Sequence, residues 1–116
     1  MTPNSVLNRL KGRELAAVSF VRDYLQLQFE PGLLNLYAWP AVIRDEVKLE
    51  LGDSGYRDSI CDQIGRQVMH VSNSNDLITF VFSGGATLAV ALGQHNSPTP
   101  EAMMFQDEDG QVWDVW

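Results

Sequence analysis

The sequence has a single cysteine, no Lys or Arg after Arg66 and no long apolar run. With only Cys61 available, no disulfide can form within the chain. Glycines interrupt the segment VFSGGATLAVALG, and no apolar stretch approaches the roughly 20 residues of a membrane-spanning helix. The opening residues, MTPNSVLNRLKGRE, lack the apolar core of a secretion signal. We therefore expect a cytoplasmic protein that does not contact membranes.

The charge that is present is mainly negative and unevenly distributed. All eight Lys and Arg residues lie at or before Arg66, and the net charge is -7. Residues 67–116 hold six acidic side chains and no basic one. Such a field repels phosphate backbones and attracts cationic surfaces, so we expect no nucleic-acid partner. The simplest interpretation is that these acids keep the surface soluble, and a basic protein partner is the alternative.

Length and composition fit one folded domain covering residues 1–116. The chain is 45% hydrophobic and 20% charged, well within the range of globular proteins. A domain of this size buries roughly two-thirds of its unfolded surface, which is enough for stability without metals or disulfides.

An internal repeat emerges when the chain is shifted by 53 residues. Residues 12–34 read GRELAAVSFVRDYLQLQFEPGLL, and residues 65–87 read GRQVMHVSNSNDLITFVFSGGAT. Without a gap, this alignment pairs Gly12 with Gly65 and Gly32 with Gly85. The shared residues fall at turns and core positions, so we predict two units, at about 1–51 and 53–116.

Each unit is predicted to contain a short helix followed by strands. Tyr56, Ile60 and Ile64 recur every four residues, and Asp53 or Ser54 precedes them as a candidate cap. In the first unit, Thr2 and Pro3 are the corresponding start signal. Strand signals follow, because apolar and polar residues alternate in two segments. The apolar positions are Leu25, Leu27 and Phe29 in one and Ile78, Phe80 and Phe82 in the other.

The predicted fold class is therefore α+β, with two pseudo-symmetric units. Each unit is a short helix followed by a three- to four-stranded antiparallel meander. The segment VKLEL at 47–51 and the final residues QVWDVW read as edge strands, and the tail from 101 to 116 reads as a hairpin. Edge strands of this kind would also permit a homodimer.

The repeated pattern resembles one found in small uncharacterised bacterial single-domain families. It consists of a helix, a glycine, a strand, then D-[YL]-x-x-x-x-F, a turn glycine and another apolar strand. Residues 23–32 and 76–85 carry it here. Some of these families resemble immunity proteins of bacterial toxin systems, so the resemblance implies a binding role. It brings no catalytic residues with it.

The side chains that could perform chemistry are few. His70 and His95 are the only histidines, and neither has a second ligand at the short spacing of a zinc motif. His70 lies on a predicted strand and is read as structural or surface-exposed, with a ligand contact as the alternative. Cys61 lies in the helical apolar stripe, so we expect a buried structural thiol. We expect no catalytic residue, metal ion or cofactor, and no enzyme.

The acidic turn DEDG at 107–110 resembles part of a calcium loop. Placing its acids at the third and fifth loop positions puts Phe105 and Trp116 where oxygen ligands are needed, so a hairpin turn is favoured. Tryptophan is frequent in interface hot spots. The predicted partner-binding residues are Asp107, Glu108, Asp109, Trp113 and Trp116.

Together these patterns predict a non-enzymatic protein-interaction module. Its sharpest form is an immunity-type protein that binds a basic partner through an acidic face. The alternative is a small-ligand-binding domain that uses a groove between the two repeats, with His70 on the groove wall.

Overall fold

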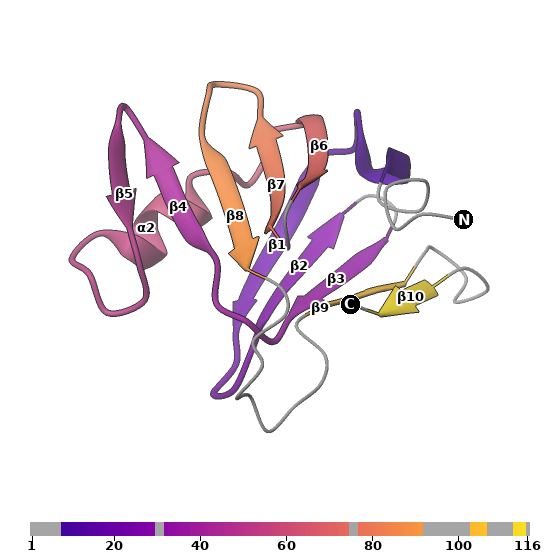
Figure 1. Ribbon diagram of the computed structural model, residues 1–116, viewed down its shortest axis with the longest axis horizontal. Helices are drawn as coiled ribbons and strands as arrows, with labels where there is room; N and C mark the ends of the chain where they lie inside the picture. The colour runs from indigo at the N-terminus through magenta and orange to yellow at the C-terminus, as the bar shows by residue number, and fades with distance from the viewer. Residues whose placement is uncertain (1–7, 30–31, 75–76, 92–102, 107–112, 116) are drawn as a thin grey trace.

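Strands dominate the fold (Figure 1). The computed structural model describes residues 8–29, 32–74, 77–91, 103–106 and 113–115. Within these residues there are ten strands, one 3-10 turn and one α-helix. In chain order they are η1 (Asn8–Leu10), β1 (Leu15–Phe20), β2 (Leu25–Phe29), β3 (Leu33–Leu36), β4 (Ala41–Arg44), β5 (Val47–Leu49), α2 (Tyr56–Cys61), β6 (Val68–Ser74), β7 (Leu77–Phe82), β8 (Thr87–Ala91), β9 (Met103–Gln106) and β10 (Trp113–Val115).

The strands form two antiparallel sheets of five strands each. Sheet 1 has the order β1-β2-β3-β9-β10, and sheet 2 has the order β5-β4-β8-β7-β6. Each sheet contains one meander of three consecutive strands. The two strands completing it come from the other part of the chain, because β4 pairs with β8 and β9 pairs with β3. The hairpins that follow the two meanders are thus exchanged between the sheets.

The two meanders have the same register at a shift of 53 residues. Leu15 pairs with Phe29 and Val68 pairs with Phe82, and a bulge follows immediately in both β1 and β6. The shift becomes 54 after the next turn, since the Phe29 N–H donates to Gly32 O and the Phe82 N–H to Ala86 O, both at 2.8 Å. The ungapped pairing of Gly32 with Gly85 is therefore off by one residue.

Reciprocal backbone hydrogen bonds join the two meanders where β1 and β6 begin. Leu15 N–H donates to Arg66 O at 2.9 Å, and Val68 N–H donates to Arg13 O at 3.0 Å. Two further bonds flank these: Gly12 N–H donates to Val68 O at 2.7 Å, and Gly65 N–H donates to Leu15 O at 2.8 Å. An antiparallel bridge between Glu14 and Gln67 lies at the centre. We call this short ribbon the seam.

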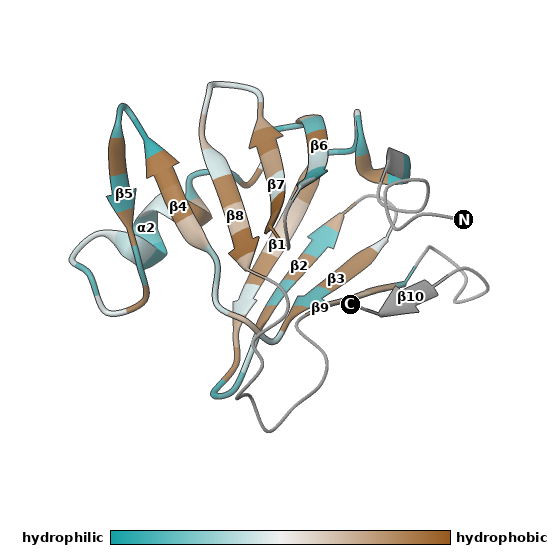
Figure 2. Cartoon of the chain, viewed as in Figure 1, coloured by the Kyte–Doolittle hydropathy of each residue, from teal (hydrophilic) through white to brown (hydrophobic). Residues whose placement is uncertain are grey.

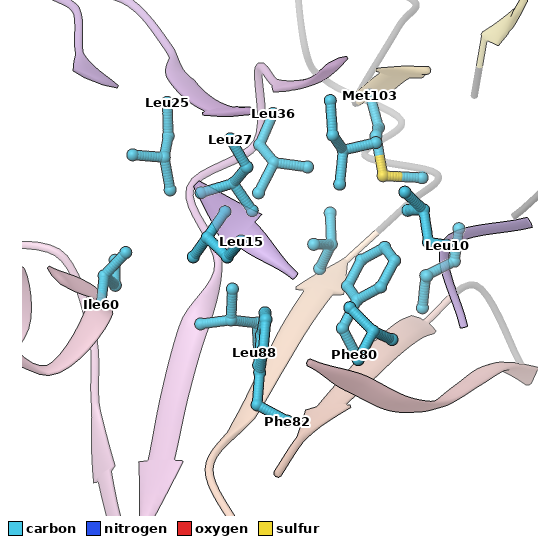
Figure 3. Packing of buried hydrophobic residues seen from close by; sticks show 14 of the residues in the cluster. Leu10, Leu15, Leu25, Leu27, Leu36, Ile60, Phe80, Phe82, Leu88 and Met103 are labelled. Atoms are coloured by element: carbon cyan, nitrogen blue, oxygen red, sulfur yellow. The ribbon is translucent and has the colours of Figure 1, made fainter. Parts of the chain in front are cut away.

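A single hydrophobic cluster fills the space between the sheets (Figure 3). Along β2 and β7 every second side chain is buried, and cartoon colouring shows the matching alternation of hydropathy along β2 (Figure 2). The predicted core residues Leu25, Leu27, Phe29, Ile78, Phe80 and Phe82 are all buried, as expected from the period-2 pattern. Gln28 faces solvent, and Gln26 is half-buried on the outer face.

The predicted α+β class with two helix-plus-meander units is wrong. The described residues are mostly strand, with one six-residue helix, α2, and the three-residue turn η1. The candidate start at Thr2 and Pro3 lies outside the described residues. The fourth and fifth strands leave their own unit: β3 pairs no further than Leu36, Pro40 offers no N–H for a ladder, and β4 pairs with β8 from Ala41 on. The chain then continues into the opposite sheet.

The helix α2 also differs from the sequence expectation at both ends. Its N-cap is Gly55, with no side-chain cap, whereas the Asp53 carboxylate accepts a hydrogen bond from Glu50 N–H at 2.7 Å. Tyr56 and Ile60 are buried, but Ile64 lies beyond the helix and is exposed. Among the described residues, no helix is long and apolar enough to cross a membrane.

Replacing Phe80 with alanine tests the shared core. The side chain is 1% exposed, so we expect Phe80→Ala to lower the free energy of unfolding by about 3–5 kcal/mol. Val81→Ala, at the outward-facing neighbour, should cost at most about 1 kcal/mol. Denaturant unfolding measures both. Equal losses for the two variants would contradict the assignment of the inner face.

Candidate functional site

The elements β4, β5 and α2 lie together at one end of sheet 2 (Figure 1). The sequence of this region is rich in carboxylates. Residues 44–62 contain six acidic and three basic side chains, a net charge of -3. All six acids are exposed. We call this region the acidic end. Its carboxylates are Asp45, Glu46, Glu50, Asp53, Asp58 and Asp62.

A tight turn between β4 and β5 projects two of these carboxylates. Arg44 pairs with Val47, which leaves Asp45 and Glu46 as a two-residue loop, hydrophilic in Figure 2. Both loop residues have positive φ, 50° and 68°. Two-residue hairpin loops require this conformation, but asparagine and glycine adopt it more readily than glutamate does. The fold thus accepts local backbone strain and places two acids at the hairpin tip.

The basic residues at the acidic end are largely occupied by contacts within the chain. Arg44 Nη1 lies 2.7 Å from Asp62 Oδ2. The Arg57 guanidinium lies 5.5 Å from the centre of the Phe20 ring, over its face. Exposed ion pairs of this kind add little stability. They do determine which charges are compensated: Arg44 pairs with Asp62 and not with Asp45 or Glu46 at the hairpin tip.

A hollow of about 570 Å³, open to solvent, lies beside the start of α2. Leu51 and Tyr56 give it apolar surface, and Asp53, Arg57 and Asp58 are its charged lining residues. The Tyr56 hydroxyl donates to Pro40 O at 2.6 Å. Burial raises the pKa of the Tyr56 phenol to about 12, so it stays protonated at neutral pH. The hollow is built from residues 51–58, so it is not a groove between the repeats.

His70 is separate from this hollow. It lies exposed on β6, where its ladder partner is Val81, on the outer face of sheet 2. No group of three His, Cys, Asp or Glu side chains suited to a metal ion is found within the described part of the chain. His95 lies outside that part.

The expectation of a buried Cys61 is wrong. The thiol is exposed at the last residue of α2, whereas the preceding Ile60 is buried. Partial burial, and then the carboxylates of Asp58 and Asp62, raise the pKa of this thiol. Asp58 thus lines the hollow and also acts on the Cys61 thiol. The negative charges of Asp58 and Asp62 disfavour the reactive thiolate form of Cys61.

Most of the predicted partner-binding residues lie outside the described residues. This holds for Asp107, Glu108, Asp109 and Trp116. The backbone of Trp113 pairs with Gln106 in the antiparallel hairpin β9–β10, and β10 is an edge strand. The tail hairpin expected from the sequence is thus present as two paired strands.

The edge strand β5 offers little backbone for a second chain. Because Arg44 and Val47 close the two-residue loop, Lys48 is the β5 residue whose N–H and C=O face outward. At Glu50 the N–H is bonded to the Asp53 side chain, and the C=O accepts from Asp53 N–H at 2.9 Å. A short edge that carries lysine and ends in a closed turn is a common protection against strand addition.

No protein-family model, curated protein or solved structure matches this chain.

The acidic end was missed by the sequence reasoning, which followed the C-terminal acids. Two signals could have found it: Asp45-Glu46 separates two alternating segments by two residues, and six acids fall within residues 44–62. The hollow had no such signal, since its residues surround a helix only six residues long.

The buried phenol of Tyr56 makes stability depend on high pH. Its pKa is raised to about 12, whereas that of an unfolded tyrosine is near 10. The stabilisation is complete below pH 10 and is lost as pH rises towards 12, by up to about 2–3 kcal/mol. Tyr56→Phe should remove this part of the pH dependence. It should also cost about 1–3 kcal/mol at pH 7, because Pro40 O loses its donor.

Chemical denaturation at pH 8 to 11.5 measures both effects. Tyr24→Phe serves as the control, because Tyr24 is only half-buried. A Tyr56→Phe variant whose stability falls with pH as steeply as that of the parent chain would refute the assignment.

Proposed function

We propose that this chain is a non-enzymatic protein-interaction module that binds a basic partner through acidic surfaces. The observation that carries the proposal is the acidic end, where six exposed carboxylates outnumber three basic side chains and five of the six carboxylates remain after Arg44 pairs with Asp62. Complementary potentials speed the encounter of two proteins and exclude wrong partners. An immunity-type role, in which the acidic surface covers a basic toxin, is its most specific form.

Two features support this proposal beyond net charge. The hollow beside α2 combines Leu51 and Tyr56 with the carboxylates of Asp53 and Asp58, which outnumber its one cation, Arg57, and suit the stem and head of an incoming lysine or arginine side chain. The C-terminal acids Asp107, Glu108 and Asp109 extend the same sign of charge in the sequence. A cytoplasmic location belongs to the proposal, because the lone thiol of Cys61 is exposed and suits a reducing compartment.

The partner is first captured with the full chain as bait and purified. The test is then the rate at which the partner and the chain associate. We expect the rate to fall as salt rises from about 0.01 to 0.15 M, because the Debye length shrinks from about 30 to 8 Å. The double variant Asp45→Asn with Glu46→Gln should slow association further. Its fold should persist, since asparagine suits the positive φ of this turn.

A charge-matched variant separates local from global charge. Glu14→Gln with Asp23→Asn also removes two exposed carboxylates, but away from the acidic end. Asp107→Asn, Glu108→Gln and Asp109→Asn together report on the C-terminal turn. Equal association rates and equal salt dependence for all three variants and the parent chain would show that neither acidic surface contacts the partner.

A further inference from the structure

The outer face of sheet 1 carries amides and tyrosines where charge would be ordinary. Ladder partners share a face, so Gln26 lies beside Asn35, and Gln28 lies beside Leu33. Tyr24 and Tyr37 continue the same rows beyond the buried Leu25 and Leu36. No charged residue occupies a described ladder position of this face. In a chain of net charge -7, the face is polar but neutral.

Sheet 2 provides an internal comparison, because its meander has the same register. Thr79 stands where sheet 1 has Gln26, Val81 stands at the position of Gln28, and Ala89 stands at that of Asn35. Leu77 and Ala91 replace the two tyrosines. The fold therefore forms this architecture without amides or aromatic rings on the outer face. Their presence on sheet 1 calls for an explanation other than folding.

The amide pair of Gln26 and Asn35 is joined by one hydrogen bond. Gln26 Nε2 donates to Asn35 Oδ1 at 3.1 Å, which fixes both side chains. Asn35 is only 8% exposed, and its Nδ2 group donates to no partner within the described part of the chain. A buried donor left unpaired costs roughly 1–3 kcal/mol, so a hydroxyl oxygen placed over it would be bound favourably. The Gln26 Oε1 atom beside it can accept the hydroxyl proton.

The tyrosines supply the apolar part of the same site. The rings of Tyr24 and Tyr37 are 5.6 Å apart at their centres and inclined by 52°. Residues two apart on a strand are separated by roughly 7 Å, so the two rings lie together on one side of the amide pair, one strand step away. The face thus joins aromatic surface to neutral donors and acceptors.

We propose that the outer face of sheet 1 binds a neutral carbohydrate. Sugar rings present C–H faces that pack on aromatic rings, and their hydroxyls both donate and accept, as the Gln26–Asn35 pair requires. Charged peptides and phosphates would gain no electrostatic attraction from a face that carries no charge. This site goes beyond the proposed function, because it lies on sheet 1 and the acidic end lies on sheet 2.

The test uses three neutral hexasaccharides, maltohexaose, cellohexaose and N-acetylchitohexaose, with an acidic oligogalacturonate as the control. Titration into the ¹⁵N-labelled full chain should shift the side-chain amide signals of Gln26 and Asn35 with at least one neutral sugar. Tyr24→Ala and Gln26→Ala should each weaken that binding about tenfold, the loss of one good contact. The matched variants Leu77→Ala and Thr79→Ala on sheet 2 should bind as the parent does.

Thermal unfolding of each variant identifies any loss that comes from unfolding. No shift with any neutral sugar at millimolar concentration would overturn the proposal, as would equal weakening in the sheet 1 and sheet 2 variants. Concentration-dependent dimerisation abolished by Tyr24→Ala would also overturn it, because a second copy would then cover this face. Each result can be obtained whether or not a basic partner is found.

Discussion

The seam between residues 12–15 and 65–68 is the constraint on which the rest of the molecule depends. Its four backbone hydrogen bonds hold the starts of β1 and β6 side by side in opposite directions. The bulges that follow Leu15 and Val68 then bend each strand into its own sheet, since a bulge adds local twist. Both of these side chains are fully buried, so the seam lies at the edge of the shared core. Two sheets that separate at the seam must face one another, and each buries its apolar side against the other (Figure 3).

The architecture repeats, but the surfaces do not. The inner faces of the two meanders carry large apolar side chains at matching positions, because both line one core. The outer faces are free of that requirement and have diverged: amides and tyrosines occupy sheet 1, and threonine and small aliphatic residues occupy sheet 2. The exchanged hairpins, by contrast, both carry acids in the sequence between their strands, Asp45-Glu46 in one and Asp107-Glu108-Asp109 in the other. In proteins generally, surface positions of this kind can change to serve binding, because substitutions there cost little stability.

The sequence predicted what depends on local periodicity and missed what depends on pairing at a distance. Alternation identified Leu25, Leu27 and Phe29 as buried, since neighbouring strand residues face opposite sides. It could not reveal that β4 joins β8, because the partner of a strand is not encoded in its own period. The turn after Phe82 is one residue longer than the turn after Phe29. The sequence alignment did not reveal this, because Gly85 matched Gly32 without a gap. Cys61 was misplaced because a helix of six residues buries only a narrow stripe, in which Tyr56 and Ile60 leave no room for it.

The exchange of hairpins between the sheets also shapes how the chain can fold. When residues 1–50 have been synthesised, β4 and β5 exist, but the strand that they must join, β8, does not. Sheet 1 in turn remains incomplete until β9 is available to cover β3. Sheet 2 therefore cannot close before residue 91 is available and sheet 1 cannot close before β10 is available, and native contacts must form across long loops, which slows folding. The same arrangement would let two chains at high concentration trade hairpins, each completing the sheet of the other.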